Sequence, residues 1–195
     1  IPRSPRIHAM ALGDAPMGRL RPARVGHVNR DRRLGHAHAR PPAPVGTGRG
    51  DRLTPALARG TFHWVLAFSS QGLSTPAVYD ECDRLRQGFA QRQPRVSEEL
   101  MHALSSGDPI SLGKSLINDL QPAACSLRPA LKLALSAGKD SGAVGALVSG
   151  SGPTVAFLAK SEEAAIDLAV ALSSTGAVSQ LGRAESPVGG PKVID

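Results

Sequence analysis

Apolar positions in the later part of the chain follow two spacings, and together they predict alternating strands and helices. Residues 62–68 form a short, largely apolar run that begins after Gly60, which indicates a buried strand. Two further apolar runs, at 144–149 and 154–159, indicate a pair of strands joined by a glycine-rich turn. Residues 177–184 are a candidate for the strand that closes the sheet.

Apolar residues three or four positions apart predict four helices between the first and second strands. The first predicted helix is capped by Thr75, has Pro76 at its first position and presents an apolar face of Val78, Cys82, Leu85 and Phe89. The other three are expected at 96–104, where Gly107 stops the helix, at 110–120, which ends near Pro122, and at 127–134, which Gly138 closes. A fifth helix is expected after Ser161, because Glu162 and Glu163 suit the positive end of a helix dipole.

This alternation predicts a two-layer α+β domain, with helices on one face of an antiparallel sheet. The pattern leaves the order of the strands open. Aromatic residues make up only 3% of the chain, so we expect a core of alanine, leucine and valine.

The first 45 residues have a different composition, and we predict a boundary between residues 1–45 and a domain at 46–195. The first segment contains nine arginines, no lysine and two aspartates, so it carries the whole net charge of +7. It also contains seven prolines, which block regular backbone hydrogen bonding. We expect this segment to be disordered or loosely draped.

Three interpretations of the basic segment remain open: an arm that binds nucleic acid, a solvated tail, and a coding stretch read out of frame. We favour the third, because it accounts for the absence of lysine, the lack of pattern and the start at Ile1. Nucleic acid is therefore not the expected partner. Its four histidines have no cysteine or acidic partners nearby, so no metal site is predicted.

Cysteine usage and hydropathy point to a cytoplasmic protein. Cys82 and Cys125 belong to no ligand cluster, which favours two reduced and mostly buried thiols. The most apolar stretch, residues 143–159, is interrupted by glycine and proline and is shorter than the roughly 20 residues that a membrane-spanning helix needs. We therefore expect no membrane partner.

The most informative run is Val148-Ser149-Gly150-Ser151-Gly152-Pro153-Thr154-Val155-Ala156. Small residues let a turn approach a ligand closely and direct N–H groups at an anion. From the residues alone, a plain turn between two strands is favoured over a phosphate cradle. No Lys-Ser/Thr pair follows, so this is not a Walker A loop.

That run resembles the third conserved motif of the GHMP kinases. Three further segments resemble the 4-diphosphocytidyl-2-C-methyl-D-erythritol kinases within that superfamily, in family order. They are Gly46-Thr47-Gly48-Arg49-Gly50-Asp51, Ser74-Thr75-Pro76-Ala77-Val78-Tyr79 and Asn118-Asp119-Leu120-Gln121-Pro122-Ala123-Ala124. The resemblance covers residues 46–195, about the second half of a family chain.

The resemblance implies a fold and an activity. The fold is a ferredoxin-like plait, with an active site between it and an N-terminal domain. The activity is transfer of the γ-phosphoryl group of ATP, with Mg²⁺, to the 2-hydroxyl of a cytidine diphosphate derivative in isoprenoid precursor synthesis.

The resemblance also implies site residues. Gly150, Ser151, Gly152 and Thr154 would line the cleft near the transferred phosphate or the methylerythritol end of the substrate. Tyr79 would lie against the cytosine ring, or it is simply a half-buried residue beside the helix face. Thr75 would help the same pocket, or only cap its helix, and we favour the cap. Asn118 and Asp119 would bond the backbone and hold the domain together.

No catalytic residue is predicted in this chain. The family takes its phosphate-cradling loop, a lysine and an aspartate from its N-terminal half, and none of these is recognisable here. Residues 35–41 stand where the family has a Gly-Ser/Ala-Asp-Val-Pro segment. The resemblance therefore does not extend to ATP binding by this chain, and we predict a kinase fragment that is inactive by itself. The alternatives are a non-catalytic ligand-binding domain or a nucleic-acid binder that uses the basic arm.

Overall fold

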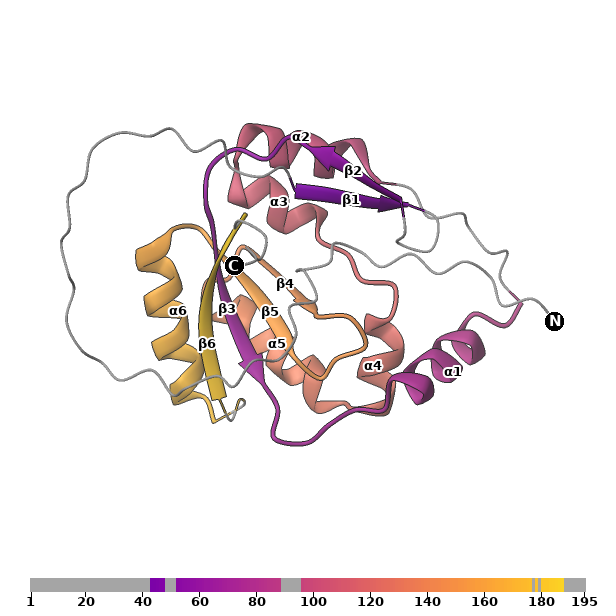
Figure 1. The fold of residues 1–195 in the computed structure, drawn as a ribbon. Helices are drawn as coiled ribbons and strands as arrows, with labels where there is room; N and C mark the ends of the chain where they lie inside the picture. Colours follow the sequence, from indigo (N-terminus) through magenta and orange to yellow (C-terminus); the bar gives the residue numbers. More distant parts are fainter. Residues whose placement is uncertain (1–42, 48–51, 89–95, 177, 179, 188–195) are drawn as a thin grey trace, which may run out of the picture.

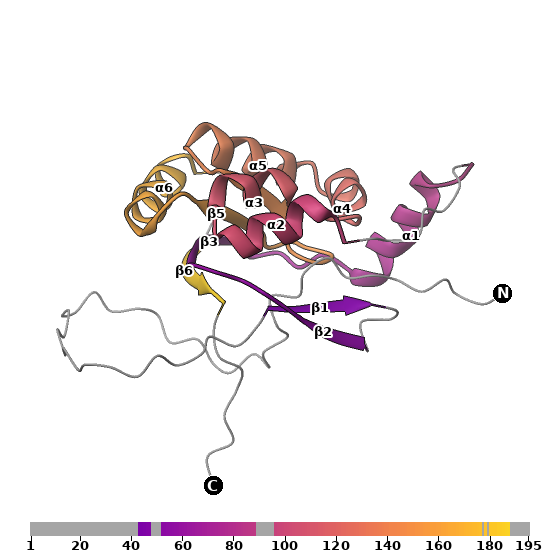
Figure 2. The ribbon, with the colours of Figure 1, turned by 90° about the horizontal axis from the view of Figure 1, so that it is seen from above.

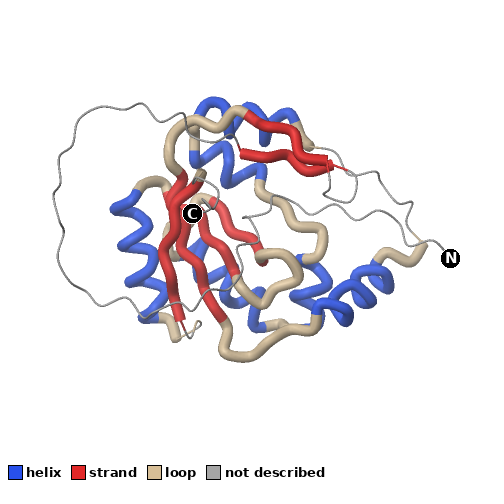
Figure 3. The backbone as a smooth tube through the Cα atoms, viewed as in Figure 1, coloured by secondary structure: helices blue, strands red, loops and turns tan. Residues whose placement is uncertain are grey.

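A four-stranded antiparallel sheet forms the centre of the molecule (Figures 1 and 3). The computed structural model describes residues 43–47, 52–88, 96–176, 178 and 180–187. The strands of the sheet are β3 (Phe62–Phe68), β4 (Gly145–Val148), β5 (Val155–Ala159) and β6 (Gln180–Ser186). Their order is β4-β5-β3-β6, so β3 pairs with β5 on one side and β6 on the other. The first three strands lie where the sequence predicts them, and the closing strand lies slightly later than predicted.

A separate hairpin precedes the sheet, and the sequence pattern did not predict it. Its strands are β1 (Ala43–Thr47) and β2 (Arg52–Ala56), which pair antiparallel with Val45 opposite Thr54. The hairpin lies on the side of the sheet away from α5 (Ala130–Asp140) and α6 (Glu162–Ser174), as Figure 2 shows. Residues 1–42, which include all four histidines of the basic segment, lie outside the described residues, so the interpretations of that segment stay predictions.

Helix α1 (Thr75–Leu85) begins where the sequence predicts, but its cap is a different residue. Ser74 is the N-cap, and its hydroxyl accepts a hydrogen bond from the Ala77 N–H at 3.5 Å. The prediction that Thr75 is the cap is therefore wrong. Thr75 already lies in the first turn, because Ser74 is the residue with extended backbone angles, and this leaves the Thr75 hydroxyl available for another partner.

Two helix boundaries were predicted correctly. Helix α2 (Glu98–Ser106) ends at Gly107, whose φ of 74° fits the left-handed cap that glycine favours. Helix α6 begins after Ser161, whose hydroxyl accepts the Ala164 N–H at 3.2 Å. Within the described residues, no helix combines the length and the apolar character that crossing a membrane requires.

Two other boundaries were predicted wrongly. The helix expected at 110–120 is shorter, α3 (Pro109–Ser115), and a further helix, α4 (Gln121–Leu127), follows it. Pro122 lies in the first turn of α4 rather than after the end of a helix, a position where proline costs no hydrogen bond. Helix α5 continues through Gly138, because this glycine serves close packing and not termination.

The sheet is covered on both faces, although the sequence predicted helices on one face only. One face packs against α5 and α6, and the buried strand residues of this cluster are Val65, Ala67, Val148, Val155, Phe157 and Ala159. The other face contributes Phe62, Trp64, Ala156 and Leu158 to a second cluster with Ala103, Leu104 and Leu112. These helical residues come from α2 and α3, which lie at the end of the sheet where β3 and β4 begin (Figures 1 and 2). All five residues of β5 are therefore buried.

A polar contact joins α1 to α4. The Glu81 carboxylate accepts hydrogen bonds from Arg84 at 2.6 and 2.8 Å and from the Ser126 hydroxyl at 2.6 Å. The Arg84 hydrogen bonds, and then the Ser126 bond, lower the pKa of Glu81 from 4.5 to about 2. The contact therefore stabilises the folded chain while Glu81 is ionised.

Replacing Glu81 by glutamine is expected to lower stability at neutral pH and to have no effect near pH 2. The folded pKa lies below the ordinary value, so the contribution is complete above about pH 4.5 and is lost as the pH falls toward 2. Urea unfolding midpoints of both proteins, measured between pH 7 and pH 3, test this. Asp80→Asn, at an exposed acid on the same helix, is the control. If the unfolding midpoints of wild type and Glu81→Gln differ by the same amount at every pH in this range, the proposed role of the ionised carboxylate is contradicted.

Candidate functional site

The glycine-rich loop, residues 149–154, is a tight turn between β4 and β5. The Ser149 N–H donates to the Thr154 carbonyl at 2.8 Å, and the Gly152 N–H donates to the Ser149 carbonyl at 2.8 Å. Gly150 and Gly152 have φ values of 55° and 82°, which residues with a side chain rarely adopt, and the Gly152–Pro153 peptide bond is cis. Both glycines are thus required by the backbone path of the turn.

Two neighbouring N–H groups at the tip of this loop are available for a ligand. Among the described residues, the backbone N–H groups of Gly150 and Ser151 have no acceptor. Gly150 is exposed and Ser151 is half-buried, so solvent or a bound anion can reach them. Successive backbone N–H groups next to a left-handed residue form the concave arrangement that binds anions in many proteins.

Asn118 holds the base of the loop. Its Nδ2 donates to the carbonyl oxygens of Val148 at 2.6 Å and Gly150 at 2.8 Å, and its Oδ1 accepts the Leu120 N–H at 2.9 Å. These are the side-chain-to-backbone bonds that the sequence led us to expect of Asn118.

The two other polar residues of this segment behave differently from expectation. The Asp119 carboxylate pairs with the Arg86 guanidinium at 3.3 Å, and among the described residues it makes none of the backbone bonds that were predicted for it. Gln121, which sequence reasoning passed over, accepts the Val148 N–H at 2.9 Å through its Oε1. Its position three residues after Asn118, at the start of a helix, was the available signal.

Thr75 lies directly against the glycine-rich loop. Its Oγ1 is 2.8 Å from the Ser151 Oγ, a hydrogen bond between residues 76 positions apart in the chain. This contact brings together two residues that the family resemblance had singled out. Tyr79 lies one helical turn after Thr75 on the same face of α1 and is half-buried. Thr154 is half-buried at the end of the loop, where its carbonyl closes the turn.

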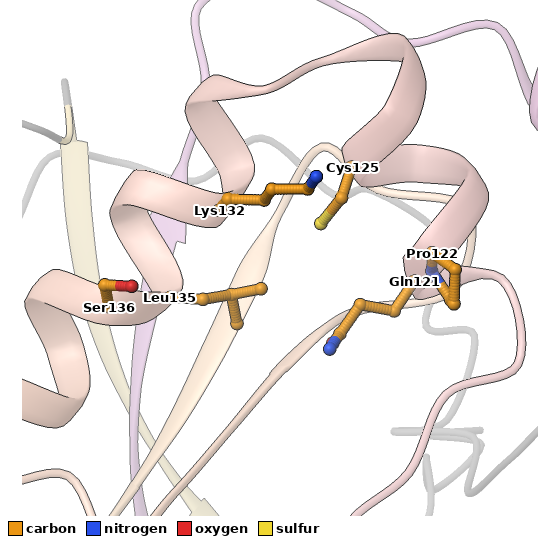
Figure 4. Close-up of a pocket in the computed structure, with 6 residues that line it drawn as sticks. All are labelled: Gln121, Pro122, Cys125, Lys132, Leu135 and Ser136. Carbon is orange, nitrogen blue, oxygen red and sulfur yellow. The ribbon is translucent and has the colours of Figure 1, made fainter.

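A shallow pocket of about 310 Å³ lies between α4 and α5, and the sequence did not predict it. Figure 4 shows its six lining residues: Gln121, Pro122, Cys125, Lys132, Leu135 and Ser136. Burial raises the pKa of the Cys125 thiol, and the nearby Lys132 amine opposes this shift only in part. Cys125 is therefore a protonated thiol at neutral pH and a poor nucleophile. Both cysteines are buried thiols that form no disulfide, as expected, and the Cys82 thiol donates to the Asp119 carbonyl at 3.8 Å.

The donor set around the glycine-rich loop does not fit Mg²⁺. This ion prefers carboxylate and phosphate oxygens, whereas the polar side chains at the loop and at the adjoining end of β4 are the hydroxyls of Thr75 and Ser151 and the amides of Asn118 and Gln121. Within the described ranges, no group of three or more histidine, cysteine or acidic side chains is placed to hold a metal ion. No phosphoryl-transfer step through Mg²⁺ can be derived from these residues.

Comparison with known proteins connects this site to a kinase family. Residues 100–178, which contain Asn118 and the whole glycine-rich loop, match the family described as GHMP kinases C terminal. The chain is 52% identical over 151 residues to the 4-diphosphocytidyl-2-C-methyl-D-erythritol kinase of Nocardia farcinica, covering 77% of this chain and 49% of that protein. The Streptomyces avermitilis kinase of the same name is 49% identical over 152 residues, covering 78% and 51%.

Solved structures agree with the sequence relatives. A crystal structure of 4-(cytidine 5'-diphospho)-2C-methyl-D-erythritol kinase has a TM-score of 0.56 and 28% identity, covering 71% of this chain and 47% of that one. Homoserine kinase from Cytophaga hutchinsonii has a TM-score of 0.54 at 21% identity, covering 70% and 45%, which shows a shared fold. The chain spans about half the length of the relatives that it matches. It therefore contains a C-terminal domain of the GHMP kinase family.

Proposed function

We propose that this chain is the substrate-binding half of an ATP-dependent kinase that phosphorylates the 2-hydroxyl of 4-diphosphocytidyl-2-C-methyl-D-erythritol in isoprenoid precursor synthesis. The observation that carries the proposal is the 2.8 Å hydrogen bond between Thr75 and Ser151. It joins the two segments whose residues resemble motifs of that family. Relatives of that name at about 50% identity support the same assignment.

The proposed roles follow from the chemistry of each group. The free N–H groups of Gly150 and Ser151 bind the anionic phosphate end of the substrate. Gly152 and Thr154 shape the turn that presents them. Tyr79 stacks against the cytosine ring, an interaction worth about 1–3 kcal/mol, and Thr75 holds the edge of the same pocket.

The proposal extends to fold and location. The succession of one strand, helices, two strands, a helix and a final strand in the order β4-β5-β3-β6 supports a ferredoxin-like plait. The protein acts in the cytoplasm on a small molecule. ATP with Mg²⁺ is the phosphoryl donor of the complete enzyme, and the 195 residues by themselves have no kinase activity.

A non-catalytic ligand-binding domain is the second candidate. It is favoured by the donor set of the described site, which offers hydroxyls and amides and no free carboxylate. Such a domain would bind the same cytidine diphosphate group without transferring phosphate.

Calorimetry on the purified chain tests the proposal. We expect cytidine diphosphate to bind, and Tyr79→Ala to weaken binding by about 1–3 kcal/mol through loss of stacking. Tyr79→Phe keeps the aromatic ring and is the matched control. A folded chain that binds no cytidine diphosphate would refute the substrate-binding role. Turnover of the substrate with ATP would refute the predicted inactivity.

A further inference from the structure

The Arg128 side chain extends from the junction of α4 and α5 to the β3–α1 loop, residues 69–74. Its Nη1 donates to the Ser69 hydroxyl at 3.1 Å and to the Gln71 carbonyl at 2.7 Å. Its Nη2 donates to the Gln71 Oε1 at 3.4 Å and to the Gly72 carbonyl at 3.0 Å. One half-buried guanidinium therefore holds four acceptors of a single exposed loop.

The loop that Arg128 holds leads directly into the candidate site. It ends at Ser74, the cap of α1, and the next residue is Thr75, whose hydroxyl bonds Ser151 in the glycine-rich loop. Leu73 lies close to the same turn, because a side-chain carbon placed on Gly152 would be 3.6 Å from Leu73 Cδ2. A shift of the β3–α1 loop would therefore move both Leu73 and Thr75 relative to the glycine-rich loop.

Helix α4 connects the two loops from its opposite ends. Asn118, three residues before the helix, bonds the glycine-rich loop and the end of β4, and Gln121, its first residue, bonds the end of β4. Arg128, at its end, bonds the β3–α1 loop. The helix has seven residues, so it is about 10 Å long, and its buried face of Ala123, Ala124 and Cys125 packs in the core. The two loops are thus attached to one rigid element.

We propose that Arg128 is a positioning residue, which holds the β3–α1 loop at the distance from the glycine-rich loop that ligand binding requires. The predicted effect of Arg128 on ligand affinity rests on the proposed function. Its role in holding the β3–α1 loop is independent of that function. Lysine cannot replace it, because the three N–H donors of an ammonium group share one nitrogen and cannot span the acceptors that the two terminal guanidinium nitrogens reach.

Hydrogen–deuterium exchange of the full chain, with calorimetric titration of cytidine diphosphate, tests this inference. In Arg128→Lys and Arg128→Gln we expect the hydrogen-bonded amides of Gln71 and Ala77, in the loop and at its junction with α1, to exchange on the order of tenfold faster, while the amides of β5 keep their rates. The dissociation constant for cytidine diphosphate is expected to rise about tenfold. Arg59→Gln, at an exposed arginine outside both loops, is the matched control.

Each outcome decides a different point. Unchanged exchange of the Gln71 and Ala77 amides in both Arg128 variants would overturn the inference, and so would faster exchange with unchanged affinity. If the wild-type chain binds no cytidine diphosphate, the proposed function fails, while the exchange rates still decide whether Arg128 holds the loop. Should the Arg128 variants unfold, Gln71→Ala removes one acceptor of Arg128 from the exposed loop, and the Ala77 amide is expected to exchange faster by a smaller factor.

Discussion

Replacing Gly138 by alanine is expected to destabilise the domain by about 1–3 kcal/mol, even though alanine is the better helix former. Gly138 is buried in α5, and a methyl group on its Cα would overlap the ring of Phe157 in β5. Phe157 is fully buried in the centre of the sheet, so its ring cannot move aside without disturbing the core. Helix α5 would have to move away from the sheet.

Urea unfolding of wild type and variant measures this effect. Gly72→Ala is the matched control, because a methyl group there has no neighbour within 4 Å and the residue does not have a positive φ. We expect the control to be neutral or slightly stabilising, since alanine restricts the unfolded chain. A Gly138→Ala protein as stable as wild type would show that the close approach of α5 to β5 is not needed.

Replacing Asn118 by aspartate is expected to cost about 1–3 kcal/mol at neutral pH and to loosen the glycine-rich loop. The two side chains have nearly the same shape, but a carboxylate cannot donate to the Val148 and Gly150 carbonyls that Asn118 Nδ2 now bonds at 2.6 and 2.8 Å. A negative charge would instead face two carbonyl oxygens. The lost hydrogen bonds are therefore those that hold the glycine-rich loop, which presents the free N–H groups of the candidate site.

The cost of Asn118→Asp is also expected to depend on pH in a defined direction. Facing carbonyl oxygens raises the folded-state pKa of the new carboxyl group above its unfolded value of about 3.9. The protonated acid can donate one of the two lost bonds, so the deficit is smallest at acidic pH and grows as the pH rises. Unfolding midpoints relative to wild type at pH 4 and pH 7 measure this, with Asp119→Asn as a neighbouring control. An equal loss of stability at pH 4 and at pH 7 would contradict this predicted pH dependence.

Local spacing was sufficient to predict the elements whose ends depend on their own residues. The strand at 62–68 is a continuous apolar run, and α6 begins at a serine followed by two glutamates, so both were predicted at their observed places. Gly107 ends α2 with a left-handed backbone, which is a property of the helix terminus itself. In the candidate site, Asn118 and the glycine-rich loop could be found from the sequence, because each of them belongs to a recognisable motif.

Elements whose ends depend on distant contacts were not predictable from spacing. Gly138 reads as a helix stop, yet it lies inside α5 because Phe157, in a strand 19 residues later, occupies the space of its side chain. Pro122 reads as a stop as well, but it starts α4, whose position is set by the Gln121 bond to Val148.

The sequence by itself determined the alternation of strands and helices, the glycine-rich turn and the kinase family. It did so because hydrophobic period, capping and turn chemistry act between residues close together in the chain. Only the tertiary structure decided the strand order, the two covered faces of the sheet, and the meeting of Thr75 with Ser151. It also placed Arg128 on the loop that leads to Thr75. These contacts join residues tens of positions apart, and the packing of the core brings such residues within hydrogen-bond distance.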